Sequence, residues 1–239
     1  MDRSGGRRVA IVGIAAVVAV TCVALGLWQL RRLEERRALN ARIVRASTAS
    51  PATVETASGI AALSPYRRVS VRGDYDVDGE VLLYGRSLRG EPGHHVITPL
   101  SLGDGSGVLV LRGWVPFSMA DRAPVTEAAP IARDVRVEGW LVAPETTGES
   151  HPDAEGVVRT LDITGIGATL PYELAPFAIQ LQDQEPPPAP FPVPIPLPER
   201  SEGPHLSYAI QWFAFGTIAA VGAAVLLRRD RRIAPSPRT

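Results

Sequence analysis

Two long uncharged runs, one near each end of the chain, constrain its architecture more than any other feature. Val9–Leu30 and Ala209–Leu227 contain no acidic or basic residue. As a helix, the second run would be roughly 28 Å long, close to the thickness of the hydrocarbon core of a bilayer. Pro204 suits a first helical position just before this run. Four arginines follow it, at Arg228, Arg229, Arg231 and Arg232. We therefore expect two transmembrane helices.

The first apolar run follows basic residues, so a cleaved signal peptide is the alternative to a membrane anchor. At roughly 22 residues the run is longer than the core of a usual signal peptide. Its exit reads L-G-L-W-Q-L-R-R, without the small-x-small pattern of a cleavage site. The next segment is typical of a helix that continues into water, where Glu34 and Arg37 could pair at a spacing of three. We favour an uncleaved anchor.

The charges are divided unevenly between the middle of the chain and its ends. Between Ser47 and Pro204 there are 21 acidic residues against 11 arginines, a net charge of −10, and the ends carry +10. Basic ends suit anionic lipid, and the folded middle lacks the basic patch of a nucleic-acid-binding protein. The positive-inside rule places the more basic side of a membrane protein in the cytoplasm. Counted over both spans, arginines number eight on the tail side and seven on the loop side, so this rule does not decide the orientation. The clear second span and the acidic loop favour cytoplasmic termini.

The resulting domain organisation alternates membrane segments with segments in water. In order, we expect a cytoplasmic tail (1–8), a transmembrane helix (9–30), a helical extension and linker (31–64), a β-rich extracytoplasmic domain (65–184), a proline-rich strap (185–203), a second transmembrane helix (204–227) and a basic cytoplasmic tail (228–239). Within the linker, 47–64 is rich in small residues and is expected to be loosely structured. The strap is expected to be extended and to act as a spacer, with a ligand for a proline-recognition module as the alternative.

The middle of the chain has the pattern of a β-rich domain. Alternating or short apolar segments separated by turn residues predict strands at 68–73, 80–85, 94–100, 107–114, 134–142, 157–160 and 177–182. A short helical or irregular piece is expected at 161–170. Closely spaced strands with little helix indicate an antiparallel barrel or sandwich.

Few residues in this domain point to catalysis or metal binding. His94 and His95 are neighbours in a predicted strand, so their side chains point to opposite faces and do not readily share a metal. His151 lies in a predicted loop and is expected to be solvated. The single cysteine, Cys22, excludes an intrachain disulfide and a paired-cysteine metal site. The motifs of serine hydrolases, P-loop proteins, zincins and dinucleotide-binding enzymes do not occur. The sequence therefore predicts no enzyme.

The start of the second apolar run carries the best candidate for a binding site. His205, Tyr208 and Trp212 share one helical face, which continues through the small residues Gly216, Ala219 and Ala223. A neutral imidazole here can ligate a haem iron axially, with the two aromatic rings beside the porphyrin and room for its plane at Gly216. In an antiparallel pair of spans, Trp28 and Gln29 would lie at the same membrane face. The alternatives are an aromatic belt above an ordinary packing face, or a histidine bonded to lipid headgroups or to the β-rich domain.

Several blocks along the chain resemble the surfeit-locus-protein-one family of cytochrome c oxidase assembly factors. They read G-L-W-Q-L-R-R, Y-R-R-V-S-V-R-G-D-Y-D, G-H-H-V-I-T-P-L, V-L-V-L-R-G-W-V-P and H-L-S-Y-A-I-Q-W-F, at Gly26–Arg32, Tyr66–Asp76, Gly93–Leu100, Val108–Pro116 and His205–Phe213. The order of these blocks and the two flanking spans also agree with the family.

The resemblance implies a non-catalytic protein that takes part in respiratory chain biogenesis. Such a protein would help the catalytic subunit of haem–copper oxidase to mature by holding or delivering haem a, with His205 as the axial ligand. Trp28, Gln29, Tyr208 and Trp212 would frame the pocket. The implied partners are that subunit, haem a synthase and the lipid bilayer, and the short N-terminus favours a bacterial plasma membrane. A scaffold without haem and a membrane-tethered enzyme remain the alternatives.

Overall fold

The computed structural model describes residues 3–131, 133–145, 148, 150–196 and 201–233. These residues form two compact units. One is helical and comes from the two ends of the chain, and the other is β-rich and spans Ile43–Pro198. Parts of the predicted tails and of the proline-rich strap, at 1–2, 197–200 and 234–239, lie outside the described residues.

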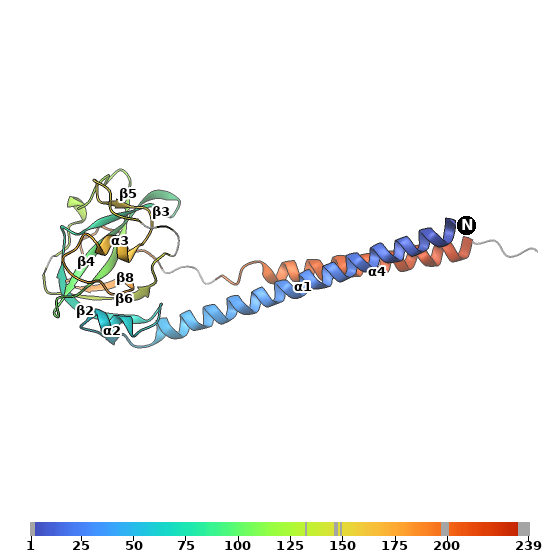
Figure 1. Ribbon diagram of the computed structural model, residues 1–239, viewed down its shortest axis with the longest axis horizontal. Coiled ribbons are helices and arrows are strands. Elements are labelled where there is room, and N and C mark those ends of the chain that lie inside the picture. The colour runs from blue at the N-terminus through green and yellow to red at the C-terminus, as the bar shows by residue number, and fades with distance from the viewer. Residues whose placement is uncertain (1–2, 132, 146–147, 149, 197–200, 234–239) are drawn as a thin grey trace, which may run out of the picture. The chain divides into compact units, whose positions relative to one another are not determined.

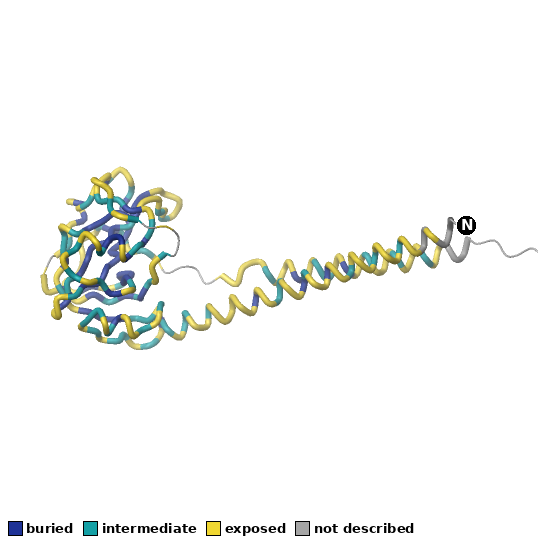
Figure 2. The backbone as a smooth tube through the Cα atoms, in the orientation of Figure 1, coloured by how far each residue is buried: buried dark blue, intermediate teal, exposed yellow. Residues whose placement is uncertain are grey.

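The helical unit contains the two predicted membrane helices. Helix α1 spans Arg3–Thr48 and helix α4 spans His205–Ile233. Both are long and apolar enough to cross a membrane, and their most apolar stretches are only 11% and 6% buried within the protein. Figure 2 shows this contrast, with α1 and α4 mostly exposed and the strands mostly buried. Apolar side chains that no protein covers suit a lipid environment, and the prediction of two such helices around a β-rich domain is confirmed.

Helices α1 and α4 lie side by side and antiparallel (Figure 1). A side chain at Gly26 would lie 2.6 Å from the Phe213 ring, and one at Gly216 would lie 3.2 Å from Cys22 Cβ. Residue numbers therefore rise along α4 as they fall along the facing side of α1. Small residues at these contacts let the two backbones approach closely, which is how helices pack in lipid.

Helix α1 continues beyond its apolar run as a charged helix. The predicted pairing of Arg37 with Glu34 is wrong, since the Arg37 guanidinium donates to both carboxylate oxygens of Glu202, at 3.0 and 2.9 Å. The pair at a spacing of three is Arg32 with Glu35, at 2.7 Å. A carboxylate from the other end of the chain thus takes the place of the local partner.

The β-rich unit is a closed barrel with short extensions. Its strands are β1 (Ala52–Thr53), β2 (Arg68–Tyr75), β3 (Val81–Leu88), β4 (Glu91–Leu102), β5 (Gly107–Pro116), β6 (Val135–Val142), β7 (Val157–Val158) and β8 (Ala178–Glu185). The ring runs β2–β6–β8–β5–β4 and closes where β4 pairs with β2, and β3 with β7 extends it beyond β4. Most pairings are antiparallel, as predicted. Three short ones are parallel: β1–β2, β3–β7 and β5–β8.

Strand β5 lies at the centre of this unit. Val108 and Val110 pack into one apolar cluster, whereas Leu109 and Leu111 pack into a second cluster on the other face. Nine of its ten residues are buried, which explains why all of its residues except Arg112 are apolar. The helical piece predicted within 161–170 is α3, Ile163–Gly167. A 3-10 turn, η1, spans Thr126–Ala128.

The prediction of a loose connector over 47–64 is wrong. This segment contains β1 and a short helix, α2 (Ala57–Ala61), which begins where Thr56 Oγ1 accepts the Gly59 N–H. Ile60 is completely buried in the barrel core. Burying one isoleucine side chain stabilises the fold by about 2–3 kcal/mol. This is enough to order a segment whose other residues are mostly small and turn-forming.

The strap after β8 contacts the barrel. Val193 forms a bridge with Trp114 of β5, through N–H to carbonyl bonds of 2.7 and 2.8 Å. The Gln180 side-chain amide donates to the carbonyl oxygens of Ile195 and Pro196, at 2.9 and 3.3 Å. A side chain thus supplies donors to a segment whose prolines have none.

Candidate functional site

The imidazole of His205 contacts a side chain of the opposing helix. Its Nδ1 lies 2.9 Å from Oε1 of Gln29, across the α1–α4 pair. His205 is the first residue of α4, directly after Pro204, and its ring is half-buried. The antiparallel pairing therefore joins two residues that are 176 positions apart in sequence.

This contact favours one tautomer of the neutral imidazole. Because an amide oxygen only accepts hydrogen bonds, the neutral ring that bonds to Gln29 Oε1 has its proton on Nδ1 and its lone pair on Nε2. Nε2 faces Gly203, where an added Cβ would lie 3.3 Å from it. Gly203 has a φ of +70°, a conformation that glycine adopts without strain. A histidine whose other nitrogen donates to a fixed acceptor is the usual arrangement of a metal ligand.

The aromatic residues predicted near His205 lie in different surroundings. Trp212 is half-buried and meets the Phe215 ring edge to face at 6.0 Å. Tyr208 and Trp28 are 46% and 52% exposed. Of the two residues expected from α1, the structure brings Gln29 to His205.

The small-residue face below His205 is occupied by the partner helix. The interpretation that Gly216 leaves room for a porphyrin plane is wrong, because Cys22 of α1 packs against it. Gly216 is buried, and Ala219 and Ala223 are half-buried. Any flat ligand held by His205 must therefore lie at the Nε2 edge of the ring, beside Gly203, and not between the two helices.

Sequence reasoning named Gln29 but missed Cys22, Gly26 and Leu33, which lie on the same face of α1 and complete this helix pair. Cys22, Gly26 and Leu33 are buried, and Gln29 is half-buried. Their spacings of four, three and four are those of a helix-packing seam. That spacing, which includes a glycine, was the one signal in the sequence that could have predicted this packing face.

The remaining histidines lie in the barrel unit and do not form a metal site. His94 is buried and His95 is half-buried on neighbouring positions of β4, while His151 is exposed in a loop. Within the described part of the chain, no three His, Cys, Asp or Glu side chains could hold a metal ion together.

His95 makes barrel stability depend on pH. Burial, with a smaller effect of the Arg86 guanidinium, lowers the pKa of His95 to about 4, from an ordinary value of 6.5. The unfolded chain therefore binds more protons between pH 4 and 6.5. The contribution of His95 is complete above about pH 6.5 and is lost as the pH falls toward 4. We expect His95→Gln to flatten the rise of unfolding free energy with pH in this window, measured by urea unfolding. His151→Gln is the control, and an equal slope in both variants would contradict the assignment.

Comparison with known proteins places this fold and site in a family. Residues 16–217, which include most of α1, the whole barrel unit and the start of α4, match the SURF1 family. The chain belongs to the SURF1 family. The SURF1 family is known generally as a family of cytochrome oxidase assembly factors. Both Gln29 and His205 lie inside the matched range.

Two SURF1-like relatives are similar over nearly the full chain, and a third is similar over less than half of it. A SURF1-like protein of Rickettsia felis is 27% identical over 91% of this chain and 96% of its own length. An uncharacterised SURF1-like protein of Mycobacterium bovis is 27% identical over 98% of this chain and 90% of its own. Surfeit locus protein 1 of Takifugu rubripes is 31% identical over 42% of this chain and 48% of its own.

Proposed function

We propose that this protein binds haem a through His205 and presents it to the catalytic subunit of haem–copper oxidase during the maturation of that subunit. The observation that carries the proposal is the 2.9 Å contact between His205 Nδ1 and Gln29 Oε1. In the neutral ring that bonds to Gln29 through Nδ1, the lone pair of Nε2 is available to an iron. Membership of a family of oxidase assembly factors supports the partner.

The residues around His205 fit an axial imidazole ligand. Gln29 keeps the proton on Nδ1 and fixes the orientation of the ring, and Gly203 places no side chain over Nε2. Haem a would supply the iron that Nε2 coordinates. Because the α1–α4 seam is closed at Gly216, the ligand would stay at the end of the helix pair, where a partner could receive it.

The same proposal includes the orientation in the membrane. The antiparallel helix pair supports two spans with both termini on one side. The four arginines after the second span favour the cytoplasm for that side of a bacterial plasma membrane. The acidic barrel domain would then be extracytoplasmic, where haem a synthase and the oxidase subunit could meet it.

The test is the absorption spectrum of the purified full chain after titration with haem a. We expect a Soret band of ligated haem in the wild type and its loss in His205→Ala. Gln29→Leu should keep Nε2 but release the ring, and we expect it to weaken haem binding about 10- to 100-fold. His151→Ala, which removes an exposed histidine of the barrel unit, is the matched control and should bind as the wild type does.

Other outcomes distinguish the alternatives. A wild-type spectrum in His205→Ala would overturn the proposed ligand. A chain that binds no haem a but co-purifies with the oxidase catalytic subunit would be a protein-only scaffold. Turnover of an extracytoplasmic substrate would indicate a membrane-tethered enzyme.

A further inference from the structure

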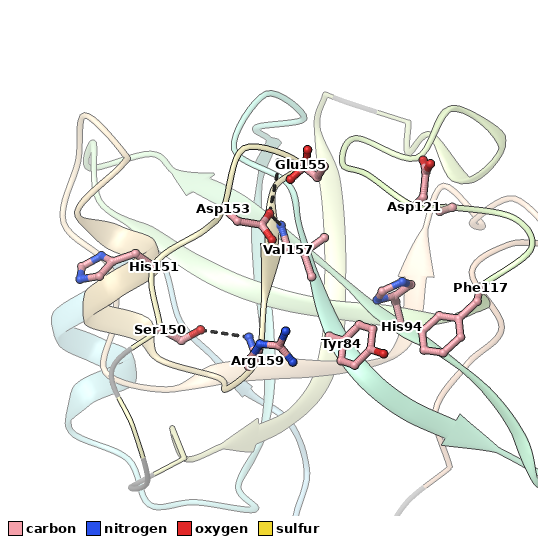
Figure 3. A pocket seen from close by; sticks show the side chains of 11 residues that line it. Tyr84, His94, Phe117, Asp121, Ser150, His151, Asp153, Glu155, Val157 and Arg159 are labelled. Carbon is pink, nitrogen blue, oxygen red and sulfur yellow. Dashed lines mark hydrogen bonds between the residues drawn. The ribbon is translucent and has the colours of Figure 1, made fainter.

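A pocket on the barrel unit gathers chemistry that the haem proposal does not use. Its volume is roughly 540 Å³, and Figure 3 shows it from close by. Tyr84 comes from β3, His94 from β4, and Phe117 follows β5 directly. The loop before β7 and Arg159 after it form the opposite wall.

The three rings form an aromatic cluster, defined here as Tyr84, His94 and Phe117. Tyr84 and Phe117 are stacked, with centroids 5.3 Å apart and an angle of 18° between planes. The His94 ring meets both of them edge to face, at 5.5 and 4.7 Å. Tyr84 and Phe117 remain 46% and 37% exposed, so this cluster presents aromatic surface to solvent.

One polar atom in this cluster has no partner. His94 is 4% exposed, lines the pocket, and its Nδ1 makes no hydrogen bond to any described residue. A buried nitrogen without a partner costs free energy that a bound donor would recover. Burial lowers the pKa of His94, so the ring is neutral at pH 7 and able to accept a hydrogen bond.

The charges around the pocket favour a cation. Asp121, Asp153 and Glu155 line it, and in Figure 3 their carboxylates lie above the aromatic cluster. Asp153 Oδ1 accepts the N–H groups of Glu155 and Val157, at 3.1 and 2.7 Å, which fixes the turn and leaves the negative charge in place. Arg122 Nε lies 3.7 Å from Asp121 Oδ1, but three carboxylates against the Arg159 guanidinium still make the lining itself negative.

Arg159 shows what the aromatic surface accepts. Its guanidinium carbon lies 5.3 Å from the centroid of the Tyr84 ring, within the range of a cation–π contact. The pocket thus already holds one guanidinium of its own chain at its aromatic wall, while the carboxylates and His94 Nδ1 offer acceptors for another donor.

We propose that this pocket is a binding site for an organic cation, such as the guanidinium of an arginine side chain or a quaternary ammonium group. The aromatic cluster contacts the cation, and Asp121, Asp153 and Glu155 supply the opposite charge. The acidic barrel domain attracts such ligands over a longer range. Arg159 lowers the affinity of the pocket for a cation, because its positive charge repels the ligand.

The test is isothermal titration calorimetry on the full chain in an uncharged detergent, with N-acetylarginine amide, choline and phosphate as separate probes. We expect the two cations to bind and phosphate not to bind. Glu155→Gln should weaken cation binding about fivefold, and Arg159→Gln should strengthen it by a similar factor. Glu91→Gln and Arg133→Gln change the net charge equally at exposed positions outside the pocket lining and should leave the affinity unchanged.

The proposal is tested by which probe binds and by the direction in which each variant changes its affinity. Tighter binding of the arginine probe assigns the site to an arginine side chain, and tighter binding of choline assigns it to a quaternary headgroup. Binding of phosphate, lost in Arg159→Gln, would overturn the proposal, as would the absence of cation binding at millimolar concentration. Thermal unfolding of each variant shows whether the barrel is intact.

Discussion

Replacing Arg112 by methionine should lower the free energy of unfolding of the barrel by about 3–5 kcal/mol. The Arg112 and Glu80 side chains are only 2% and 0% exposed, and Nη1 lies 3.1 Å from Glu80 Oε2. Nη2 of Arg112 donates to the Ala128 carbonyl at 2.6 Å. Without the guanidinium, the buried Glu80 carboxyl group would have no opposite charge beside it.

The partners of Glu80 explain why it cannot escape to water. Its Oε2 accepts the Thr98 hydroxyl at 2.7 Å, and its Oε1 accepts the Val125 N–H at 2.8 Å. Adding Glu80→Gln to Arg112→Met removes both charges, so the double variant should lose about 1–3 kcal/mol less than the sum of the single variants.

Urea unfolding of the full chain in detergent measures both effects. Fluorescence of the barrel residues Trp114 and Trp140 is followed in a background with Trp28→Phe and Trp212→Phe. The control is Arg72→Met, since Arg72 lies 2.6 Å from Asp134 but the pair is 69% and 74% exposed. Breaking this shorter pair should cost less than about 1 kcal/mol. An equal cost for the two arginine variants would contradict the argument that burial, not distance, decides.

The second large effect is expected at Gly139 of β6. A Cβ here would overlap the backbone carbonyl oxygen of Gln180 and lie 2.7 Å from Ile179 Cγ2. Gly139 pairs with Leu181 of β8 beside a register shift, so the carbonyl cannot move without disturbing the β6–β8 pairing, which is part of the ring. We expect Gly139→Ala to cost about 3 kcal/mol, at the upper end of overpacking effects.

The same unfolding measurement tests this prediction. Gly103 has no atom within 4 Å of an added Cβ, so Gly103→Ala is the matched control and should change the stability by less than about 0.5 kcal/mol. A small effect at Gly139 would show that β8 can shift away from β6.

Local patterns in the sequence were sufficient to predict where most strands lie, but not which strands pair with each other. The alternation of Arg68–Gly73 predicted β2, and the apolar run Val108–Leu111 within Gly107–Trp114 predicted β5. The three parallel pairings depend on which distant strands meet, and strand periodicity carries no such information. Ala57, Ile60 and Leu63 recur at a spacing of three and share one core cluster, but this segment is too short for its spacing to predict a helix.

The candidate site could also be predicted only in part from local patterns in the sequence. Helical spacing placed His205 on a face, and an antiparallel pair of spans brought Gln29 to the same depth. The exposure of Tyr208 and the contact of Cys22 with Gly216 depend on how the two helices are rotated, which spacing alone does not determine. The aromatic cluster comes from β3, β4 and the segment after β5, so only the folded barrel assembles it.

The position of β8 within the ring has a consequence for biosynthesis. β8 lies between β6 and β5 although it is the last strand of the chain, and it ends at Glu185, shortly before α4 begins at His205. The ring stays open while the ribosome makes everything up to that strand. In the proposed topology, the earlier strands would reach the far side of the membrane with unpaired edges, which are prone to aggregation until the final strand arrives.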